Sequence, residues 1–160
     1  ELMVVVSCSK NLGLYKERVG AISIVSSNSS NKEKALSNLT SVARSIYSMP
    51  PDHGAAIALE VLTDSTLREE WINELSEVRG RIKSVRHLLA SKLNSNQKDI
   101  NFSFIENEKG MFSFLGLKKE QVILLREEFN IYMVESSRVN IAGINASNLE
   151  YLTESIRRVI

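Results

Sequence analysis

Residues 2–20 read LMVVVSCSKNLGLYKERVG, and this stretch decides the fold class. Its first part, Leu2–Val6, is a continuous apolar run with β-branched residues, which is typical of a central parallel strand covered on both faces. A second run of this kind, Val19–Val25, predicts another strand. The first half of the chain offers few neighbours for such strands, so we expect part of the protein to precede Glu1. Unpaired apolar strands also predict self-association of an isolated fragment.

Helices and short strands are predicted for the rest of the chain. Three capping boxes, each a serine or threonine followed three residues later by glutamate, predict helix starts at Ser30, Thr66 and Ser147. The predicted helices cover residues 33–46, 55–62, 67–93, 119–129 and 147–160, and the predicted strands cover 102–105, 111–115 and 131–134. The long helix 67–93 carries one apolar stripe and should bridge two lobes. Its charged residues, Arg86 among them, are expected on a solvated face.

Composition excludes several classes of protein. Twenty Lys and Arg residues against nineteen Asp and Glu residues give a net charge of +1, which makes no electrostatic case for binding nucleic acid or an acidic membrane. The single cysteine, Cys8, excludes an internal disulfide and suits a reducing compartment, so a cytoplasmic location is expected. His53 and His87 have no carboxylate or cysteine at ligand spacing, and no metal site is predicted.

The residues that can carry chemistry concentrate in segment 7–20. Lys10 follows the end of the first predicted strand between the hydroxyls of Ser7 and Ser9, and Arg18 comes eight residues later. Hydroxyls and a guanidinium bind phosphate, and the neutral amine of a partly desolvated lysine forms a Schiff base with an aldehyde. Pyridoxal phosphate carries both a phosphate and an aldehyde. On spacing alone, a polar loop with solvated Lys10 and Arg18 stays open as the simpler interpretation.

Four segments together resemble a known enzyme family. Besides 7–20, they are 44–55 (RSIYSMPPDHGA), 110–114 (GMFSF) and 137–143 (SRVNIAG). In order and spacing they resemble class I pyridoxal-phosphate aminotransferases of the aspartate and aromatic (tyrosine) subgroup, over essentially the whole chain. The resemblance implies an α/β fold, the C-terminal portion of a fold type I pyridoxal-phosphate-dependent transferase. Residues 1–65 would end the large cofactor-binding domain, and 66–160 would form the bridging helix and the small domain.

The resemblance also implies how the cofactor is held. Lys10 would form the Schiff base with pyridoxal phosphate and, once released, would carry a proton between the substrate α-carbon and the cofactor. Arg18 would bind the cofactor phosphate, helped by Ser7 and Ser9.

The resemblance assigns substrate contacts to residues further along the chain. Arg138 would hold the substrate α-carboxylate, since a guanidinium fork matches a carboxylate. Arg44 would bind the distal carboxylate of aspartate or glutamate, reaching in from the other subunit of a homodimer with Tyr47 and Ser48 nearby. Phe112 would line the substrate pocket.

The chain departs from the family pattern at three positions. Lys16 stands where asparagine or another small or polar residue is usual, Cys8 replaces an aromatic residue, and Met49 replaces an asparagine. The family also places an aspartate under the pyridine nitrogen, and this residue precedes the lysine motif and cannot be located in the sequence. We therefore expect the C-terminal part of an aminotransferase, with little or no activity by itself.

Two functions are compatible with these residues. The first is transfer of an amino group from aspartate or an aromatic amino acid to 2-oxoglutarate through pyridoxal phosphate. The second is a non-catalytic chain that retains the fold for association or regulation. The joint presence of Lys10, Arg18, Arg44 and Arg138 favours the first, because a structural chain needs none of them at these spacings.

Overall fold

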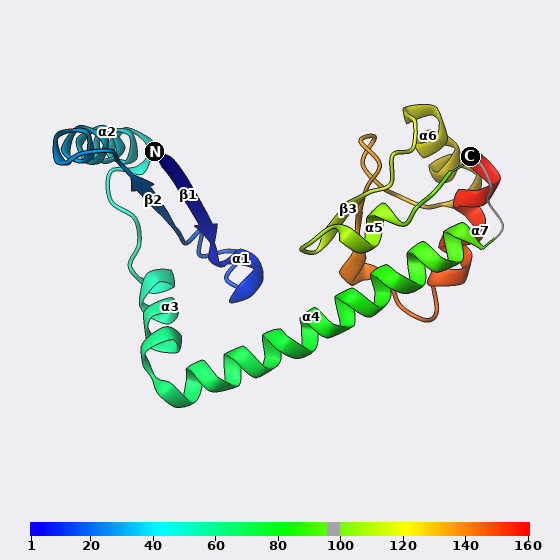
Figure 1. Ribbon diagram of the computed structural model, residues 1–160, viewed down its shortest axis with the longest axis horizontal. Coiled ribbons are helices and arrows are strands. Elements are labelled where there is room, and N and C mark those ends of the chain that lie inside the picture. Colours follow the sequence, from blue (N-terminus) through cyan, green and yellow to red (C-terminus); the bar gives the residue numbers. More distant parts are fainter. Residues whose placement is uncertain (96–99) are drawn as a thin grey trace. The chain divides into compact units, whose positions relative to one another are not determined.

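The computed structural model describes residues 1–95 and 100–160 and forms two compact units, Glu1–Leu75 and Ser76–Ile160 (Figure 1). The first unit contains β1 (Leu2–Ser7), α1 (Cys8–Asn11), β2 (Gly20–Val25), α2 (Ser29–Tyr47) and α3 (His53–Thr63). Helix α4 (Ser65–Asn94) begins in the first unit and ends in the second. The second unit adds α5 (Phe104–Asn107), β3 (Phe112–Phe114), α6 (Lys119–Phe129), β4 (Arg138–Asn140), the 3₁₀ helix η1 (Ile141–Gly143) and α7 (Leu149–Val159). The assignment of 1–65 and 66–160 to a large and a small domain stays a prediction.

The first unit contains an antiparallel pair of strands. β1 and β2 pair from Leu2 opposite Val25 to Ser7 opposite Gly20, which confirms both predicted strands. The expected parallel, covered strand is wrong for the described residues, where β1 pairs with β2 alone and is exposed along its length. The chain returns beside β1 because the N–H of Cys8 donates to the carbonyl of Val19, which joins the two ends of the connection directly. Gly20 suits this return, because a Cβ there would lie 2.3 Å from the carbonyl oxygen of Val6.

The helices form where the sequence predicts them, but the predicted capping boxes are wrong. Asn28 caps α2, since its side chain accepts a hydrogen bond from the N–H of Asn31 at 2.9 Å. Asp64 accepts from the N–H of Leu67 at 2.9 Å at the start of α4. α7 begins after Asn148. Asparagine and aspartate cap helices at least as well as serine and threonine, and in α2 and α4 one of them stands two residues before the predicted cap.

The second unit is built around a continuous hydrophobic core. α6 forms over the predicted range, and β3 confirms the strand predicted at 111–115. The strand predicted at 102–105 is wrong: α5 covers part of it, and the buried Phe102 and Ile105 stand one helical turn apart. The strand predicted at 131–134 is also wrong, because the partner of β3 is β4. Among the described residues, the core consists of Leu89, Ala90, Leu93, Phe102, Ile105, Leu115, Leu117, Val122, Leu125, Ile141, Ile144, Leu149, Leu152 and Ile156.

One charged residue lies against this core. Arg86 of α4, expected on a solvated face, is only 3% exposed. The prediction fails because Arg86 stands three and four residues before Leu89 and Ala90, which places it on the buried face of the helix. Within the described part of the chain, no helix is long and apolar enough to cross a membrane.

Candidate active site

The lysine motif folds into a compact loop between β1 and β2. Ser7 caps α1: its hydroxyl accepts from the N–H of Ser9 at 3.2 Å and donates to the Ser9 hydroxyl at 3.0 Å. The N–H of Cys8 donates to the carbonyl of Val19 at 3.0 Å and closes the loop. Lys10 lies at the end of the single turn of α1 and is exposed, whereas Ser9 is buried. The loop therefore carries an exposed lysine next in sequence to a pair of hydrogen-bonded serines.

Tyr15 links Lys10 and Arg18 within this loop. Lys10 Nζ lies 4.1 Å from the centroid of the Tyr15 ring, in the geometry of a cation–π contact. The Arg18 guanidinium donates to the carbonyl oxygen of Tyr15 at 3.1 Å. Both basic side chains thus contact one residue, although Arg18, like Lys10, is exposed. Sequence reasoning did not single out Tyr15; its place between Lys10 and Arg18 was the available signal.

Trp71 anchors the turn that carries Lys10. Its indole N–H donates to the carbonyl oxygen of Asn11 at 2.7 Å, so the first part of α4 is tied to the residue after the lysine. The Asn11 side-chain oxygen is buried and has no hydrogen-bond partner among the described residues. Trp71 was expected only as a member of an apolar stripe, and its additional role depends on a contact 60 residues away in sequence.

The start of α3 packs against the segment that carries Arg18. His53 Nδ1 lies 3.0 Å from a carboxylate oxygen of Glu17. Gly54 is buried, and a Cβ built on it would lie 2.7 Å from the Cβ of Glu17 and 3.3 Å from that of Val19. The absence of a side chain at Gly54 thus lets α3 approach the residues on either side of Arg18.

We expect Gly54→Ala to destabilise the first unit. The added methyl group would force α3 away from Glu17 and Val19, at a cost of about 1–3 kcal/mol. Gly80→Ala is the matched control, because a Cβ at Gly80 meets nothing within 4 Å, and alanine in a helix interior should stabilise by about 0.5–1 kcal/mol. Denaturant unfolding of both variants measures the difference. Equal stability of Gly54→Ala and the wild type would contradict this packing.

Arg44 and Ser48 lie at the end of α2. The N–H of Ser48 donates to the carbonyl of Arg44 at 3.0 Å, and Ser48 has a positive φ of 64°. The Arg44 side chain is exposed. In residues 1–95 and 100–160, no hydrogen bond or ion pair joins Arg44 or Ser48 to the Lys10 loop.

Arg138 and Phe112 are candidate site residues of the second unit. They stand on the paired strands β4 and β3, and the Arg138 guanidinium carbon lies 4.7 Å from the centroid of the Phe112 ring. A surface pocket of about 500 Å³ opens beside them. Its lining is formed by Phe112, Arg126, Ile131, Tyr132, Met133, Val134, Arg138, Val139, Asn140 and Leu152.

The backbone before Arg138 is held in an unusual conformation. Ser137 is buried and has a φ of 60°, in the left-handed region that favours glycine. Its hydroxyl accepts from the N–H of Gly116 at 3.0 Å, and its carbonyl accepts from the N–H of Leu115 at 3.0 Å. These two contacts fix the direction in which β4, and with it Arg138, leaves the turn.

Left-handed backbone marks the candidate site more widely. Among the described non-glycine residues, positive φ angles occur at Arg18, Ser48, Asn130 and Ser137. Asn130 ends α6, which is an ordinary place for this conformation. The other three are candidate site residues or the neighbour of one. Backbone strain of this kind persists where the surrounding structure imposes it, and it is concentrated at functional sites.

A surface ion pair ties α6 to the loop before Arg138. Lys119 Nζ lies 2.9 Å from a Glu135 carboxylate oxygen, and this hydrogen bond and the lysine charge hold the pKa of Glu135 below its ordinary value. Because the pKa is lowered in the folded protein, the pair supports the fold at neutral pH. That support is lost as the pH falls through the lowered pKa.

The candidate site residues thus fall into groups on both units. Ser7, Ser9, Lys10 and Arg18 share one loop, and Arg138 and Phe112 share one strand pair. Within the described ranges, no group of three or more His, Cys, Asp and Glu residues is placed to hold a metal ion.

Comparison with known proteins identifies the family. The sequence profile of aminotransferase class I and II matches residues 1–156. The chain belongs to this family. It is 49% identical over 160 residues to an aspartate aminotransferase of Haemophilus influenzae, covering all of this chain and 40% of that protein. It is 40% identical over 159 residues to an aromatic-amino-acid aminotransferase of Paracoccus denitrificans, covering 99% of this chain and 40% of that protein.

Solved aminotransferase structures have the same fold. An aromatic-amino-acid aminotransferase from Burkholderia pseudomallei, covalently bound to pyridoxal phosphate, matches with a TM-score of 0.84 and 43% identity, covering 98% of this chain and 39% of that chain. An aromatic amino acids aminotransferase from Psychrobacter sp. B6 matches with a TM-score of 0.86 and 43% identity, covering 99% of this chain and 40% of that chain. The expected fold type I transferase class is confirmed. The chain spans about 40% of the length of the curated relatives it matches.

Proposed function

We propose that the protein is an aminotransferase that moves an amino group from aspartate or an aromatic amino acid to 2-oxoglutarate, with pyridoxal phosphate as its cofactor. The observation that carries the proposal is the loop between β1 and β2, which holds Lys10, the hydrogen-bonded Ser7 and Ser9, and Arg18, with Lys10 and Arg18 both in contact with Tyr15. Membership of the aminotransferase family supports it.

The residues of this loop fit pyridoxal phosphate by their chemistry. A phosphate monoester is bound by hydroxyl groups and guanidinium, and an aldehyde reacts with a primary amine. Ser7, Ser9 and Arg18 provide the first set, and Lys10 provides the amine. When bound, the cofactor supplies an aldehyde for the amino group and a ring that withdraws electrons from the substrate α-carbon.

Lys10 is the residue that handles the proton. Its Nζ would take a proton from the substrate α-carbon as a general base and would deliver it to the cofactor as a general acid. Tyr15 restricts where that amine can lie, because the ring face contacts the Lys10 ammonium group. Trp71 restricts the backbone after it through the carbonyl of Asn11. Tyr15 thus restricts the Lys10 amine, and Trp71 restricts the backbone next to Lys10.

Arg138 binds the α-carboxylate of the amino acid. The Arg138 guanidinium lines the pocket and lies against the Phe112 ring. This stacking holds the plane of the guanidinium, and therefore the directions of its N–H groups. A guanidinium in a fixed plane binds a carboxylate through two parallel hydrogen bonds. Phe112 also lends the pocket an apolar wall.

Arg44 is proposed to bind the distal carboxylate of a dicarboxylic substrate in the site of the other subunit of a homodimer, with Ser48 beside it. Its exposed side chain at the end of α2, without a tie to the Lys10 loop in the described residues, supports a role outside its own loop. The cytoplasm stays the predicted location.

Mixing two variants that are each inactive toward aspartate tests the placement of Arg44. Arg44→Ala alone should lose activity toward aspartate and keep activity toward phenylalanine, because only aspartate carries a second carboxylate. In a mixture of Arg44→Ala and Lys10→Ala subunits, hybrid dimers contain one site with both an intact Lys10 and an intact Arg44 from the partner. We expect part of the aspartate activity to return on mixing. No recovery, with hybrid dimers demonstrated by mass spectrometry, would contradict an arginine supplied by the other subunit.

Formation of glutamate tests the proposed function itself. The protein, expressed as its gene encodes it, is supplied with pyridoxal phosphate, 2-oxoglutarate and aspartate, phenylalanine or tyrosine. Glutamate should appear with at least one of these donors. Cofactor binding without glutamate from any donor would favour the non-catalytic alternative.

A further inference from the structure

Arg86 is a buried charged residue that the proposed function does not use. It projects from α4 within the second unit, and its side chain is 3% exposed. A buried guanidinium is costly unless its N–H groups are satisfied, so its partners indicate what it is there to hold.

The partners of Arg86 lie on one short segment that runs from α5 into β3. Both terminal nitrogens of the guanidinium donate hydrogen bonds. The acceptors are the carbonyl oxygens of Ile105 at 3.0 Å, Gly110 at 2.9 Å and Phe112 at 2.8 Å, the hydroxyl of Ser113, and a carboxylate oxygen of Glu108 at 3.4 Å. One rigid, planar group therefore holds the nine-residue segment 105–113 through hydrogen bonds.

Arginine suits this task better than lysine or an apolar residue. Most of the acceptors are backbone carbonyls, so Arg86 holds the main chain of the segment directly. A planar fork with fixed N–H directions sets the positions of several acceptors at once, whereas an ammonium group is a point charge on a flexible stem. Arg86 thus fixes the backbone of Gly110 and Phe112 relative to α4.

The segment held by Arg86 carries the ring that supports Arg138. Phe112 opens β3, and β3 pairs with β4, where Phe114 lies opposite Arg138. The Phe112 ring lies 4.7 Å from the Arg138 guanidinium carbon. The path from Arg86 to the carboxylate-binding group therefore has two contacts, the Arg86–Phe112 hydrogen bond and the Phe112–Arg138 stacking.

We propose that Arg86 is a positioning residue for substrate recognition: by fixing Phe112, it sets where the Arg138 guanidinium lies and how well it binds a carboxylate. This inference rests on the proposed role of Arg138. Arg86 contacts no substrate, and its effect is on affinity for the amino acid and not on the proton transfer at Lys10.

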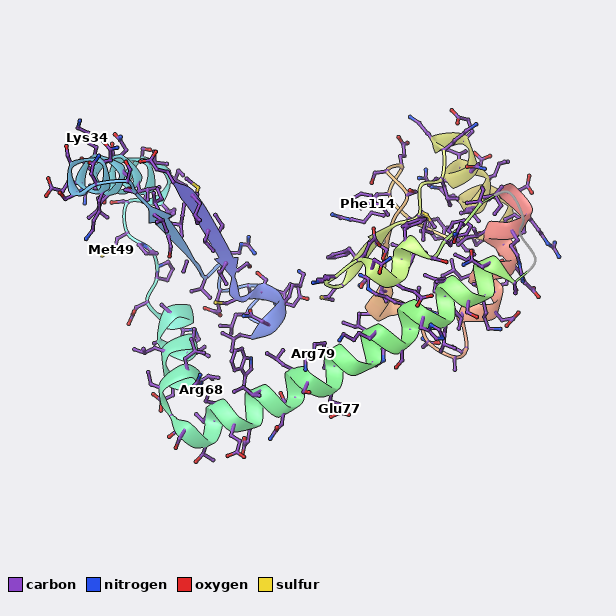
Figure 2. All side chains as sticks on the ribbon, in the orientation of Figure 1. Lys34, Met49, Arg68, Glu77, Arg79 and Phe114 are labelled. Carbon is purple, nitrogen blue, oxygen red and sulfur yellow. The ribbon has the colours of Figure 1, made fainter. Side chains whose placement is uncertain are left out.

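Three variants of the holoenzyme test the inference. Arg86→Met removes the fork and the charge, and Arg86→Lys keeps the charge without the fork. Arg79→Met is the control, because Arg79 lies exposed on the same helix (Figure 2) and its one bond among the described residues, at 3.4 Å, joins it to Ser76 of α4 itself. For Arg86→Met we expect KM for the amino acid to rise about 10- to 100-fold, since a misplacement of about 1 Å has an effect of this size. kcat and borohydride labelling of Lys10 should stay close to wild type.

Arg86→Lys should show a smaller rise in KM, and Arg79→Met should show none. Where Arg86→Met does not fold, Arg86→Lys decides alone. A merely structural role would lower apparent kcat and cofactor labelling together, in proportion to the lost folded protein, and would leave KM unchanged. That result, or an unchanged KM in both Arg86 variants, would overturn the inference.

Hydrogen–deuterium exchange separates this inference from the proposed function. In the Arg86 variants, amides of residues 110–115 and 138–141 should exchange faster, while those of α6 and α7 should keep wild-type rates. If the wild-type protein forms no glutamate, the proposed function fails, and this pattern still decides whether Arg86 positions the Phe112–Arg138 pair. Unchanged exchange in both strands would overturn the inference whatever the activity.

Discussion

Replacing Lys10 with alanine is expected to reduce aminotransferase activity by more than about 10⁴-fold, because general base and acid catalysis by a placed side chain alone contributes about 10²–10⁴-fold and the covalent tie to the cofactor is lost as well. The fold should tolerate the change, since Lys10 is exposed, its amine lies over the Tyr15 ring, and this amine makes no hydrogen bond or ion pair among the described residues. Glutamate formation under single-turnover and steady-state conditions measures the loss.

Lys16→Ala is the matched control for Lys10→Ala. Lys16 is an exposed lysine of the same loop, without a hydrogen bond or ion pair in the described structure. It should keep near wild-type activity and a normal melting temperature. The assignment of Lys10 fails if both alanine variants lose activity equally, or if Lys10→Ala retains more than a small fraction of it.

Replacing Arg138 with alanine is expected to raise KM for every amino acid substrate by about 100-fold, because hydrogen bonds between a guanidinium and a carboxylate are worth about 3 kcal/mol. Labelling of Lys10 by cofactor and borohydride should be unaffected. Arg138→Lys keeps the charge but loses the paired hydrogen bonds, so its KM should lie between those of Arg138→Ala and the wild type.

Arg126 provides the control for Arg138, because its side chain lines the same pocket. Arg126→Met should leave KM within the range of the wild type. If Arg126→Met raises KM and Arg138→Ala does not, the carboxylate is bound by Arg126 and not by Arg138. In that case the substrate role of Phe112 and the positioning role of Arg86 both lose their basis.

Periodicity predicted those parts of the fold in which local pattern and tertiary packing agree. The apolar residues of 119–129 recur at helical spacing, and Val122 and Leu125 are buried where α6 meets the core. Segment 102–105 shows the limit of this reasoning. Its alternating aromatic residues favoured a strand, but Phe104 is 40% exposed while Phe102 and Ile105 are buried, which is the pattern of one helical turn.

The candidate site was predicted through its motifs, and what supports those motifs was missed. Lys10, Arg18 and Arg138 stand out because their residue types and spacing match a family. Trp71 and Arg86 act on segments 60 and 19–27 residues away in sequence, so their partners are visible only in the folded chain. The spacing of Arg86 from Leu89, Ala90 and Leu93 was a usable signal of burial, which the surrounding charges obscured.

The backbone conformations at Arg18, Ser48 and Ser137 could not be predicted from residue type. Positive φ angles are read from sequence mainly at glycine and asparagine, and neither arginine nor serine favours them. At Ser137 the conformation is imposed by hydrogen bonds to Leu115 and Gly116, which lie more than 20 residues away. Tertiary contacts here override the local preference.

The central claim, that Lys10 holds pyridoxal phosphate in an aminotransferase site, is tested most directly by chemical trapping. The protein is incubated with pyridoxal phosphate, reduced with borohydride and digested, and the labelled peptide is mapped by mass spectrometry. Our account predicts stoichiometric label on Lys10 and on no other lysine. Label scattered over several lysines, or no label, would contradict it.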